Sequence, residues 1–251
     1  MWSFFHKLGS PPWMYGISGR ILSWLLPLTL LLLAWGAVWG LLYAPPDFRQ
    51  GHSFRIIYVH VPASVVALAG YYVMAGAGAV SLIWKMKMAD VAMKACAPIG
   101  AALTFLGLLS GAVWGKPTWG AWWVWDARTT SMLILLFLYL GVMALYAAWD
   151  DEALAAKACA LLALVGTVNI PIIYKSVDWW YSLHQPASIS LSGDSSVHSD
   201  MMQPLWLMIA AFYCLFVCSL LLTMRGEILR RESNTGWVRG LLMTGEGGRA
   251  V

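Results

Sequence analysis

The chain alternates between long apolar runs and short polar connections from residue 21 onwards. Six of the runs reach the roughly 20 helical residues that are needed to cross the hydrocarbon core of a bilayer. They cover residues 21–43, 62–84, 96–114, 129–149, 153–174 and 202–224. The pattern predicts an all-α integral membrane protein with six transmembrane helices. The first run is too long and too rich in tryptophan to be a signal-peptide core, so we expect it to be a retained span.

Composition and charge support this class and indicate an orientation. Hydrophobic residues make up 60% of the 251 residues and charged residues 11%, against about 45–50% and about 25% in soluble domains. If the N-terminus is cytoplasmic, eleven of the sixteen lysines and arginines lie on the inner side, as the positive-inside rule favours. Both termini are then cytoplasmic. This topology accounts for the net charge of +4, and nothing indicates nucleic-acid binding.

The polar connections divide into two groups. The outer segments cover residues 44–61, 115–128 and 175–200, whereas the inner connections are short and the tail after Arg225 is polar. We expect the tail to lack regular structure and the functional chemistry to lie outside. Asn169 and Pro171 predict a kink in the fifth span. No internal repeat or second domain is evident, so residues 1–251 are expected to form a single membrane domain.

The segment 115–128, together with the end of the preceding span, is unusually rich in tryptophan. It carries Trp114, Trp119, Trp122, Trp123 and Trp125, followed by Asp126 and Arg128. Five tryptophans in twelve residues compare with fewer than one expected from the chain's 16 in 251. Flat indole faces with one N–H donor each suit a large planar aromatic ligand such as a porphyrin. The alternative is a dense aromatic belt that only anchors the loop at the membrane boundary.

The sequence allows two geometries for this segment. A short surface helix would gather Trp119, Trp122, Trp123 and Asp126 on one face. An extended strand would align Trp119, Trp123 and Trp125 instead. Either geometry produces an aromatic shelf at the depth of the lipid headgroups.

Two of the five histidines lie beside this shelf. His60 is at the outer mouth of the second span, and His184 follows the fifth span closely. Two imidazoles on one membrane face could supply both axial ligands of a haem iron, although either one alone could simply be a hydrogen-bonded interfacial residue. His6 is expected on the inner side, and His52 and His198 stand in polar stretches.

Outer charged residues offer partners for such a ligand. Arg55, Lys116 and Arg128 are on the correct side to meet the anionic propionates of haem. Arg55 and Lys116 could equally be boundary cations that extend towards the headgroups. Asp126 could instead orient Arg128 or an indole N–H. The chain has no C-x-x-C-H motif, so it does not carry a thioether-bound haem of its own.

Three strings carry a resemblance to a known family. WGKPTWGAWWVWDAR, IIYVHVP and WWYSLHQP, together with six spans, closely resemble the haem exporter protein C family, also called the cytochrome c maturation protein C family. The resemblance covers nearly the whole chain. It implies His60 and His184 as the axial ligands of haem b. It also implies that the segment from Trp114 to Arg128 presents haem to a membrane-anchored periplasmic haem chaperone.

The resemblance further implies partners and a location. The expected partners are the ATPase and membrane subunits of an ABC transporter and a small single-span subunit, in a bacterial inner membrane. Any ATPase activity would belong to a partner, because the sequence shows no ATPase motif. Two rival hypotheses are a cytochrome b-type electron-transfer subunit, whose histidines normally lie within spans, and a haem-free assembly scaffold.

Overall fold

The computed structural model describes residues 7, 9–184 and 197–247. His6 and positions 185–196 of the third outer segment therefore lie outside the described residues. The helices, in chain order, are α2 (Pro11–Val38), the π-helix η1 (Trp39–Tyr43), the 3-10 helix η2 (His52–Ile56), α3 (Ile57–Trp84), α4 (Lys87–Trp119), α5 (Ala127–Ala148), α6 (Glu152–Gly166), α7 (Asn169–Trp179), α8 (Ser199–Arg231) and α9 (Gly236–Gly247). The described ranges contain no β-strand, only an isolated bridge between Asp47 and Gly51.

Within the described residues, six helical segments are long and apolar enough to cross a membrane. Each predicted span coincides with one of them, so the prediction of an all-α membrane protein with six spanning helices is confirmed. The helices extend beyond the apolar runs; α4, for example, begins at Lys87 rather than at residue 96. The fifth segment leaves regular helix between α6 and α7, where a kink was predicted. There the side-chain amide of Asn169 donates to the carbonyl of Ser131 (2.9 Å).

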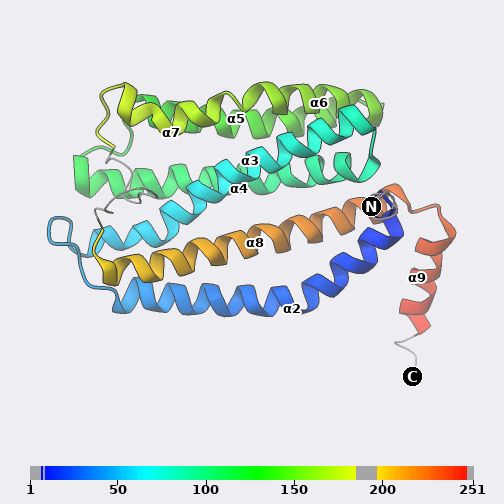
Figure 1. Ribbon diagram of the computed structural model, residues 1–251, viewed down its shortest axis with the longest axis horizontal. Helices are drawn as coiled ribbons and strands as arrows, with labels where there is room; N and C mark the ends of the chain where they lie inside the picture. The colour runs from blue at the N-terminus through cyan, green and yellow to red at the C-terminus, as the bar shows by residue number, and fades with distance from the viewer. Residues whose placement is uncertain (1–6, 8, 185–196, 248–251) are drawn as a thin grey trace.

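The helices form a bundle whose two ends differ in chemistry (Figure 1). Helices α2 and α8 pack together on one side, α3 and α4 occupy the middle, and α5, α6 and α7 cover the other side. Helix α2 begins and α8 ends at one end, which we call the charged end. The connections at residues 44–51 and 120–126 lie at the opposite end, which we call the tryptophan end. This alternation places the first two outer segments and the described parts of the third, residues 175–184 and 197–200, at the same end of the bundle.

Glycines allow the middle of the bundle to pack closely. A Cβ at Gly100 would lie 2.0 Å from Cζ of Tyr139, and one at Gly166 would lie 1.9 Å from the hydroxyl of Tyr71. The Tyr139 hydroxyl donates to the carbonyl of Ala67 (2.8 Å). Small residues let helices approach one another in a membrane, where van der Waals packing rather than hydrophobic burial drives association. This packing fixes the relative positions of α3, α4 and α5, which carry the site described below.

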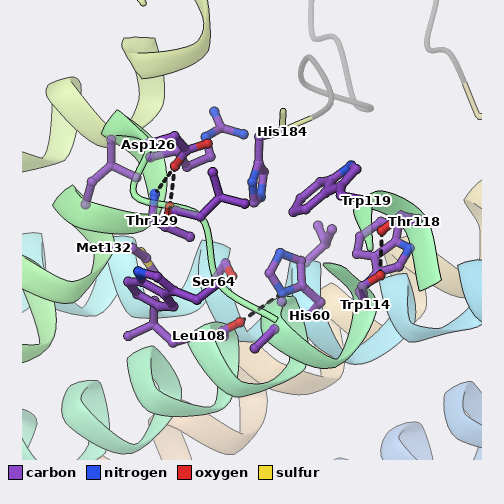
Figure 2. Close-up of a pocket in the computed structure, with 18 of the residues that line it drawn as sticks. His60, Ser64, Leu108, Trp114, Thr118, Trp119, Asp126, Thr129, Met132 and His184 are labelled. Atoms are coloured by element: carbon purple, nitrogen blue, oxygen red, sulfur yellow. Dashed lines mark hydrogen bonds between the residues drawn. The ribbon is translucent and has the colours of Figure 1, made fainter. Parts of the chain in front are cut away.

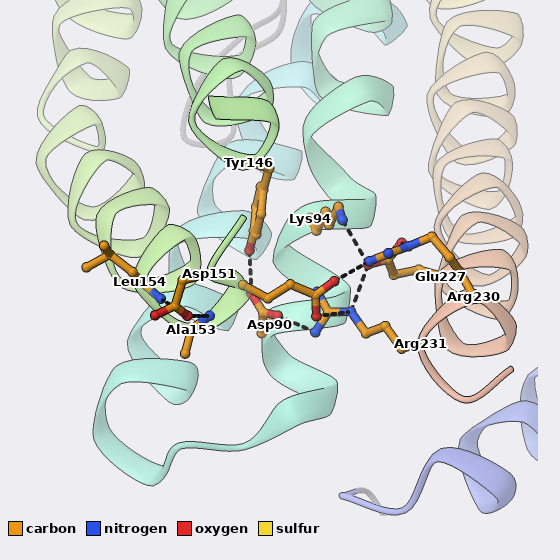
Figure 3. A network of polar contacts seen from close by, with 10 residues as sticks. Asp90, Lys94, Tyr146, Asp151, Ala153, Leu154, Glu227, Arg230 and Arg231 are labelled. Carbon is orange, nitrogen blue, oxygen red and sulfur yellow. Dashed lines mark hydrogen bonds and ion pairs between the residues drawn. The ribbon is translucent and has the colours of Figure 1, made fainter. Parts of the chain in front are cut away.

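A network of charged and polar side chains ties the helices together at the charged end (Figure 3). Its members are Asp90, Lys94, Tyr146, Glu152, Glu227, Arg230 and Arg231. Glu227 forms ion pairs with Lys94 (2.9 Å), Arg230 (2.8 Å) and Arg231 (2.7 Å). Asp90 pairs with Arg231 (2.5 Å) and accepts a hydrogen bond from the Tyr146 hydroxyl. The network therefore joins α4 and α5 to the last turns of α8.

The prediction that the tail after Arg225 lacks regular structure is wrong. Helix α8 continues to Arg231, where the ion pairs hold its last turn, and α9 follows after a short turn. The Trp237 ring packs against Tyr15, with 5.7 Å between the ring centroids, and Val238 is buried. Apolar residues of the tail are thus buried against the bundle. The polar composition of the tail did not indicate this contact.

Candidate functional site

The tryptophan-rich segment adopts neither of the two regular geometries over its full length. Helix α4 continues as far as Trp119 and ends at Gly120, whose left-handed backbone (φ 79°) is the usual glycine helix stop. Residues 121–126 then run without regular structure until α5 begins at Ala127. Asp126 caps α5 by accepting the backbone N–H of Thr129 (2.8 Å). The segment is consequently a helix end, an irregular stretch and a helix start.

A cavity of about 260 Å³ opens at the tryptophan end (Figure 2). It lies between α3, α4 and α5, and the irregular stretch 121–126, α7 and residue 184 complete its wall. Its inner part is lined by apolar side chains that include Leu68, Leu108 and Met132, whereas Asp126 and Arg128 line the part nearest the loops. The volume is close to the lower limit of small-molecule sites, roughly 300 Å³. An apolar interior with a few polar groups suits a largely apolar ligand that has a polar edge.

His60 stands in the first turn of α3 with a defined tautomer. Its Nδ1 lies 3.0 Å from the carbonyl oxygen of Gly107 and 3.2 Å from the hydroxyl of Ser110. A carbonyl can only accept, and the Ser110 hydroxyl already donates to the carbonyl of Leu106 (2.6 Å), so Nδ1 carries the proton. The lone pair is then on Nε2. An N–H···O=C bond from the other ring nitrogen is the usual orienting contact of a metal-binding histidine.

Close packing holds the His60 ring against α4. A Cβ at Gly111 would lie 3.0 Å from Cε1 of His60, so only a glycine leaves full room for the imidazole there. On another side, the Trp114 ring meets His60 edge-on, with centroids 5.6 Å apart. The Trp114 indole N–H is itself fixed by the side chain of Gln50 (2.7 Å). His60 therefore has little freedom to turn away from the cavity.

His184 lines the cavity from the chain that follows α7. Its Nδ1 is buried and has no hydrogen-bond partner among the described residues. Burial, reinforced by the positive charge of Arg128, lowers the pKa of His184 to about 4. The imidazole is therefore neutral at physiological pH and can offer a lone pair without first losing a proton. Its ring packs on Trp119, with centroids 5.1 Å apart.

The two imidazoles come together although they lie far apart in sequence. The ring centroids of His60 and His184 are 6.3 Å apart and the ring planes are inclined by 42°; both line the same cavity (Figure 2). Each ring has a tryptophan partner, Trp114 for His60 and Trp119 for His184. The separation of the two rings is that expected for two imidazole ligands of one metal ion.

The tryptophans divide by their position relative to the cavity. Those that line it are Trp114, Trp119, Trp122 and Trp123. Trp123 has a buried indole nitrogen without a hydrogen-bond partner among the described residues. Trp125 does not line the cavity; it packs edge-on against Trp123 and is 75% exposed. The cluster thus provides both an aromatic lining and an exposed aromatic surface beside it.

The predicted cations are placed differently from one another. Arg128 lines the cavity, and its guanidinium donates to the carbonyl of Tyr174 (3.2 Å) and the hydroxyl of Ser176 (3.4 Å). Arg55 and Lys116 do not line it. Arg55 donates to the carbonyls of Leu41 and Ala44 (2.7 Å each) at the end of η1, and Lys116 donates to the carbonyl of Gly120 (3.1 Å).

Asp126 forms a hydrogen bond with neither of the groups considered from the sequence, although its negative charge acts on the Arg128 guanidinium. Its carboxylate accepts hydrogen bonds from Thr129 and Ser182 rather than from Arg128 or an indole. Burial raises its pKa, but the hydrogen bonds from Ser182 and Thr129 outweigh burial and hold the pKa below its ordinary value. The carboxylate therefore stays ionised. The Asp-x-x-Thr spacing at a helix start is a capping signal that could have been noticed in the sequence.

Several contributing residues had no signal in the sequence. Ser110 and Gly111 position His60 from α4, and Ser182 contacts Asp126. Tyr174 supplies a carbonyl to Arg128 and lines the cavity. Small and hydroxyl-bearing residues occur throughout the chain, so only their position in the fold identifies these.

The fold and the site together define a multi-pass helical membrane protein with a tryptophan-lined cavity flanked by two histidines. Residues 4–239 match the family model described as Heme exporter protein C. A Heme exporter protein C of Haemophilus influenzae is 47% identical over 244 residues, which cover 97% of this chain and 99% of that protein. The Heme exporter protein C of Escherichia coli K12 is 46% identical over 243 residues, covering 97% and 98%, and that of Bradyrhizobium diazoefficiens is 49% identical over 225 residues, covering 90% and 85%.

Such identity along nearly the full length of both chains is decisive. This chain belongs to the Heme exporter protein C family.

Proposed function

We propose that this protein binds haem b in the cavity at the tryptophan end, with His60 and His184 as the axial ligands of the iron. The observation that carries the proposal is the 6.3 Å separation of the two ring centroids. Metal–imidazole bonds of about 2 Å, with ring nitrogens roughly 1 Å from their centroids, place two trans imidazoles about 6 Å apart. The separation of the two centroids therefore supports ligation of one iron by both rings.

The tautomers and the lining support the same ligand. Nε2 of His60 has a free lone pair because Nδ1 donates to Gly107, and the buried Nδ1 of His184 lacks a partner among the described residues. Trp119, Trp122 and Trp123 line the cavity and suit the faces of a porphyrin. Arg128 is the cavity-lining cation of the three considered for propionates. Arg55 and Lys116 instead donate to backbone carbonyls outside the cavity.

We infer that the bound haem is cargo for the biogenesis of c-type cytochromes. The protein would present haem at the periplasmic face of a bacterial inner membrane to a membrane-anchored haem chaperone. It would act as a transport component beside ABC transporter subunits, which supply the ATPase, and a small single-span subunit. The names of the relatives, Heme exporter protein C, support the haem-export part of this proposal. The ends of the helices, rather than the bundle centre, carry the histidines, which favours presentation over cytochrome b-type electron transfer.

The direct test is the absorption spectrum of the purified protein after addition of haem b. Two imidazole ligands predict a six-coordinate, low-spin spectrum. A haem-free preparation that shows no spectral change on titration with haem would overturn the proposal and favour an assembly scaffold. A five-coordinate spectrum would reject the two-histidine assignment.

The orientation can be tested with alkaline phosphatase fusions, because this enzyme is active only outside the cytoplasm. A fusion after Ala121, in the irregular stretch of the tryptophan end, is expected to be active. A fusion after Asp150, in the turn before α6, is expected to be inactive, since eleven of sixteen basic residues favour the inner side for that end. The reverse pattern would contradict the proposed periplasmic site.

Two substitutions in the aromatic cluster should affect haem binding and haem delivery differently. Trp119→Ala removes a ring that packs on His184, and the lost contact, about 0.5–1.5 kcal/mol, should weaken haem binding roughly two- to tenfold. Trp125→Ala removes an exposed ring outside the cavity, so haem content and spectrum should be unchanged while loading of the chaperone falls. Haem-stained gels of both proteins measure the two quantities together. Normal chaperone loading by Trp125→Ala would reduce this residue to a membrane anchor.

A further inference from the structure

The position of His184 depends on a segment with little structure of its own. Helix α7 ends at Trp179. Among the described residues, residues 180–184 form one backbone–backbone hydrogen bond, from the N–H of Trp180 to the carbonyl of Ser176 (3.0 Å). Tyr181 is 89% exposed and Leu183 is also exposed. The segment therefore contributes little to the core, and packing alone does not determine where the imidazole lies.

One serine connects this segment to the start of α5. The Ser182 hydroxyl donates to Oδ2 of Asp126 and accepts the backbone N–H of His184 (3.0 Å). The other carboxylate oxygen of Asp126 is held by Thr129 in the first turn of α5. A continuous chain of hydrogen bonds thus runs from the N-terminus of α5 through Asp126 and Ser182 to the backbone of His184.

A second set of hydrogen bonds also joins the start of α5 to the α7 region. Arg128, two residues after Asp126, donates to the carbonyl of Tyr174 and to Ser176 in the last turns of α7. The two charged residues at the start of α5 therefore hold the chain on both sides of the α7 terminus. Charged hydrogen-bond partners form stronger bonds than neutral ones, which suits them to fix an otherwise loosely held segment.

We propose that Ser182, acting through Asp126, is a positioning residue that sets the place of His184 opposite His60 and so determines how firmly the second axial ligand binds the haem iron. The inference rests on the proposed haem site. It assigns the Asp126 carboxylate to holding the ligand-bearing segment rather than to contacting haem. Partners that orient a metal-binding histidine commonly change metal affinity by about 10- to 100-fold when they are removed.

The test compares Ser182→Ala with Ser182→Thr in the full-length protein loaded with haem b in detergent. Ser182→Ala is expected to show a new five-coordinate, high-spin fraction and about tenfold faster loss of haem to apomyoglobin. Added imidazole should restore its low-spin spectrum, because the vacant coordination position is open while the cavity is intact. Ser182→Thr keeps a hydroxyl and should resemble the parent protein.

A matched control is Ser199→Ala, which also removes a serine beside an aspartate, here Asp200 at the start of α8. It should leave the spectrum unchanged. A parental spectrum in Ser182→Ala would overturn the positioning role. A second outcome would also overturn the positioning role: a lowered melting temperature of Ser182→Ala together with a spectrum that added imidazole does not restore. The Ser182 hydroxyl would then support the fold rather than the position of His184. A parent protein without a six-coordinate spectrum would instead overturn the haem site itself.

Discussion

Replacing both His60 and His184 by alanine is expected to abolish the six-coordinate spectrum and to lower haem affinity by more than roughly tenfold. Both rings line the cavity, and their centroids are 6.3 Å apart. Removal of both leaves the aromatic lining as the main attraction for haem, without any bond to the iron. Titration with haem b, followed by absorption spectroscopy, measures the ligation and the affinity together.

The single variants and one control sharpen this expectation. His60→Ala and His184→Ala should each retain one ligand and become five-coordinate, and added imidazole should convert both back to low spin. His198→Ala is the control, because His198 is an exposed residue that caps α8 through the N–H of Asp200 (3.3 Å). A low-spin spectrum that survives the double substitution would show that other side chains bind the iron.

The second large effect concerns stability at the charged end. Glu227→Ala should lower the free energy of unfolding by about 3–5 kcal/mol, since it removes the shared partner of three cations, of which Arg231 is itself largely buried. The Glu227 side chain is 11% exposed and pairs with Lys94, Arg230 and Arg231. The corresponding fall in melting temperature is on the order of 10 °C. Thermal unfolding in detergent, followed by circular dichroism, measures it.

Glu152→Ala provides the matched comparison. Glu152 pairs with Arg230, and both side chains are about half exposed. Its second ion pair, with Arg231, is longer (3.7 Å). Exposed ion pairs contribute about 0–1 kcal/mol, so this variant should unfold nearly as the parent does. Equal destabilisation by the two substitutions would mean that the network behaves as a set of surface salt bridges. Haem binding, at the other end of the bundle, should be retained by both variants below their melting temperatures.

The placement of the helices followed from the sequence because a bilayer imposes a simple requirement. A span needs about 20 apolar residues and internally satisfied backbone groups, and six runs meet it. Helix ends were predicted poorly for the same reason. Helices such as α4 and α8 continue past their apolar stretches into polar residues, where capping and ion pairs rather than hydropathy decide the last turn.

The candidate site was predictable only as a set of residue types. The density of tryptophan and the two outer histidines pointed to a porphyrin site before any geometry was considered. The Asp-x-x-Thr spacing could have indicated that Asp126 caps a helix, but the contacts of Arg55 and Arg128 were not predictable. Arg55 is engaged by carbonyls at the end of η1, and such acceptors arise only where a helix ends in a particular geometry.

The sequence by itself determined the class of this protein, its six spans and the chemistry gathered at one end, because these depend on composition and on spacing along the chain. Tertiary structure alone decided that His60 and His184 share one cavity and that Asp126 and Arg128 hold the end of α7. The physical reason is that these contacts join residues on different helices. Their distances are set by how α3, α4, α5 and α7 pack, and local sequence carries no record of that packing.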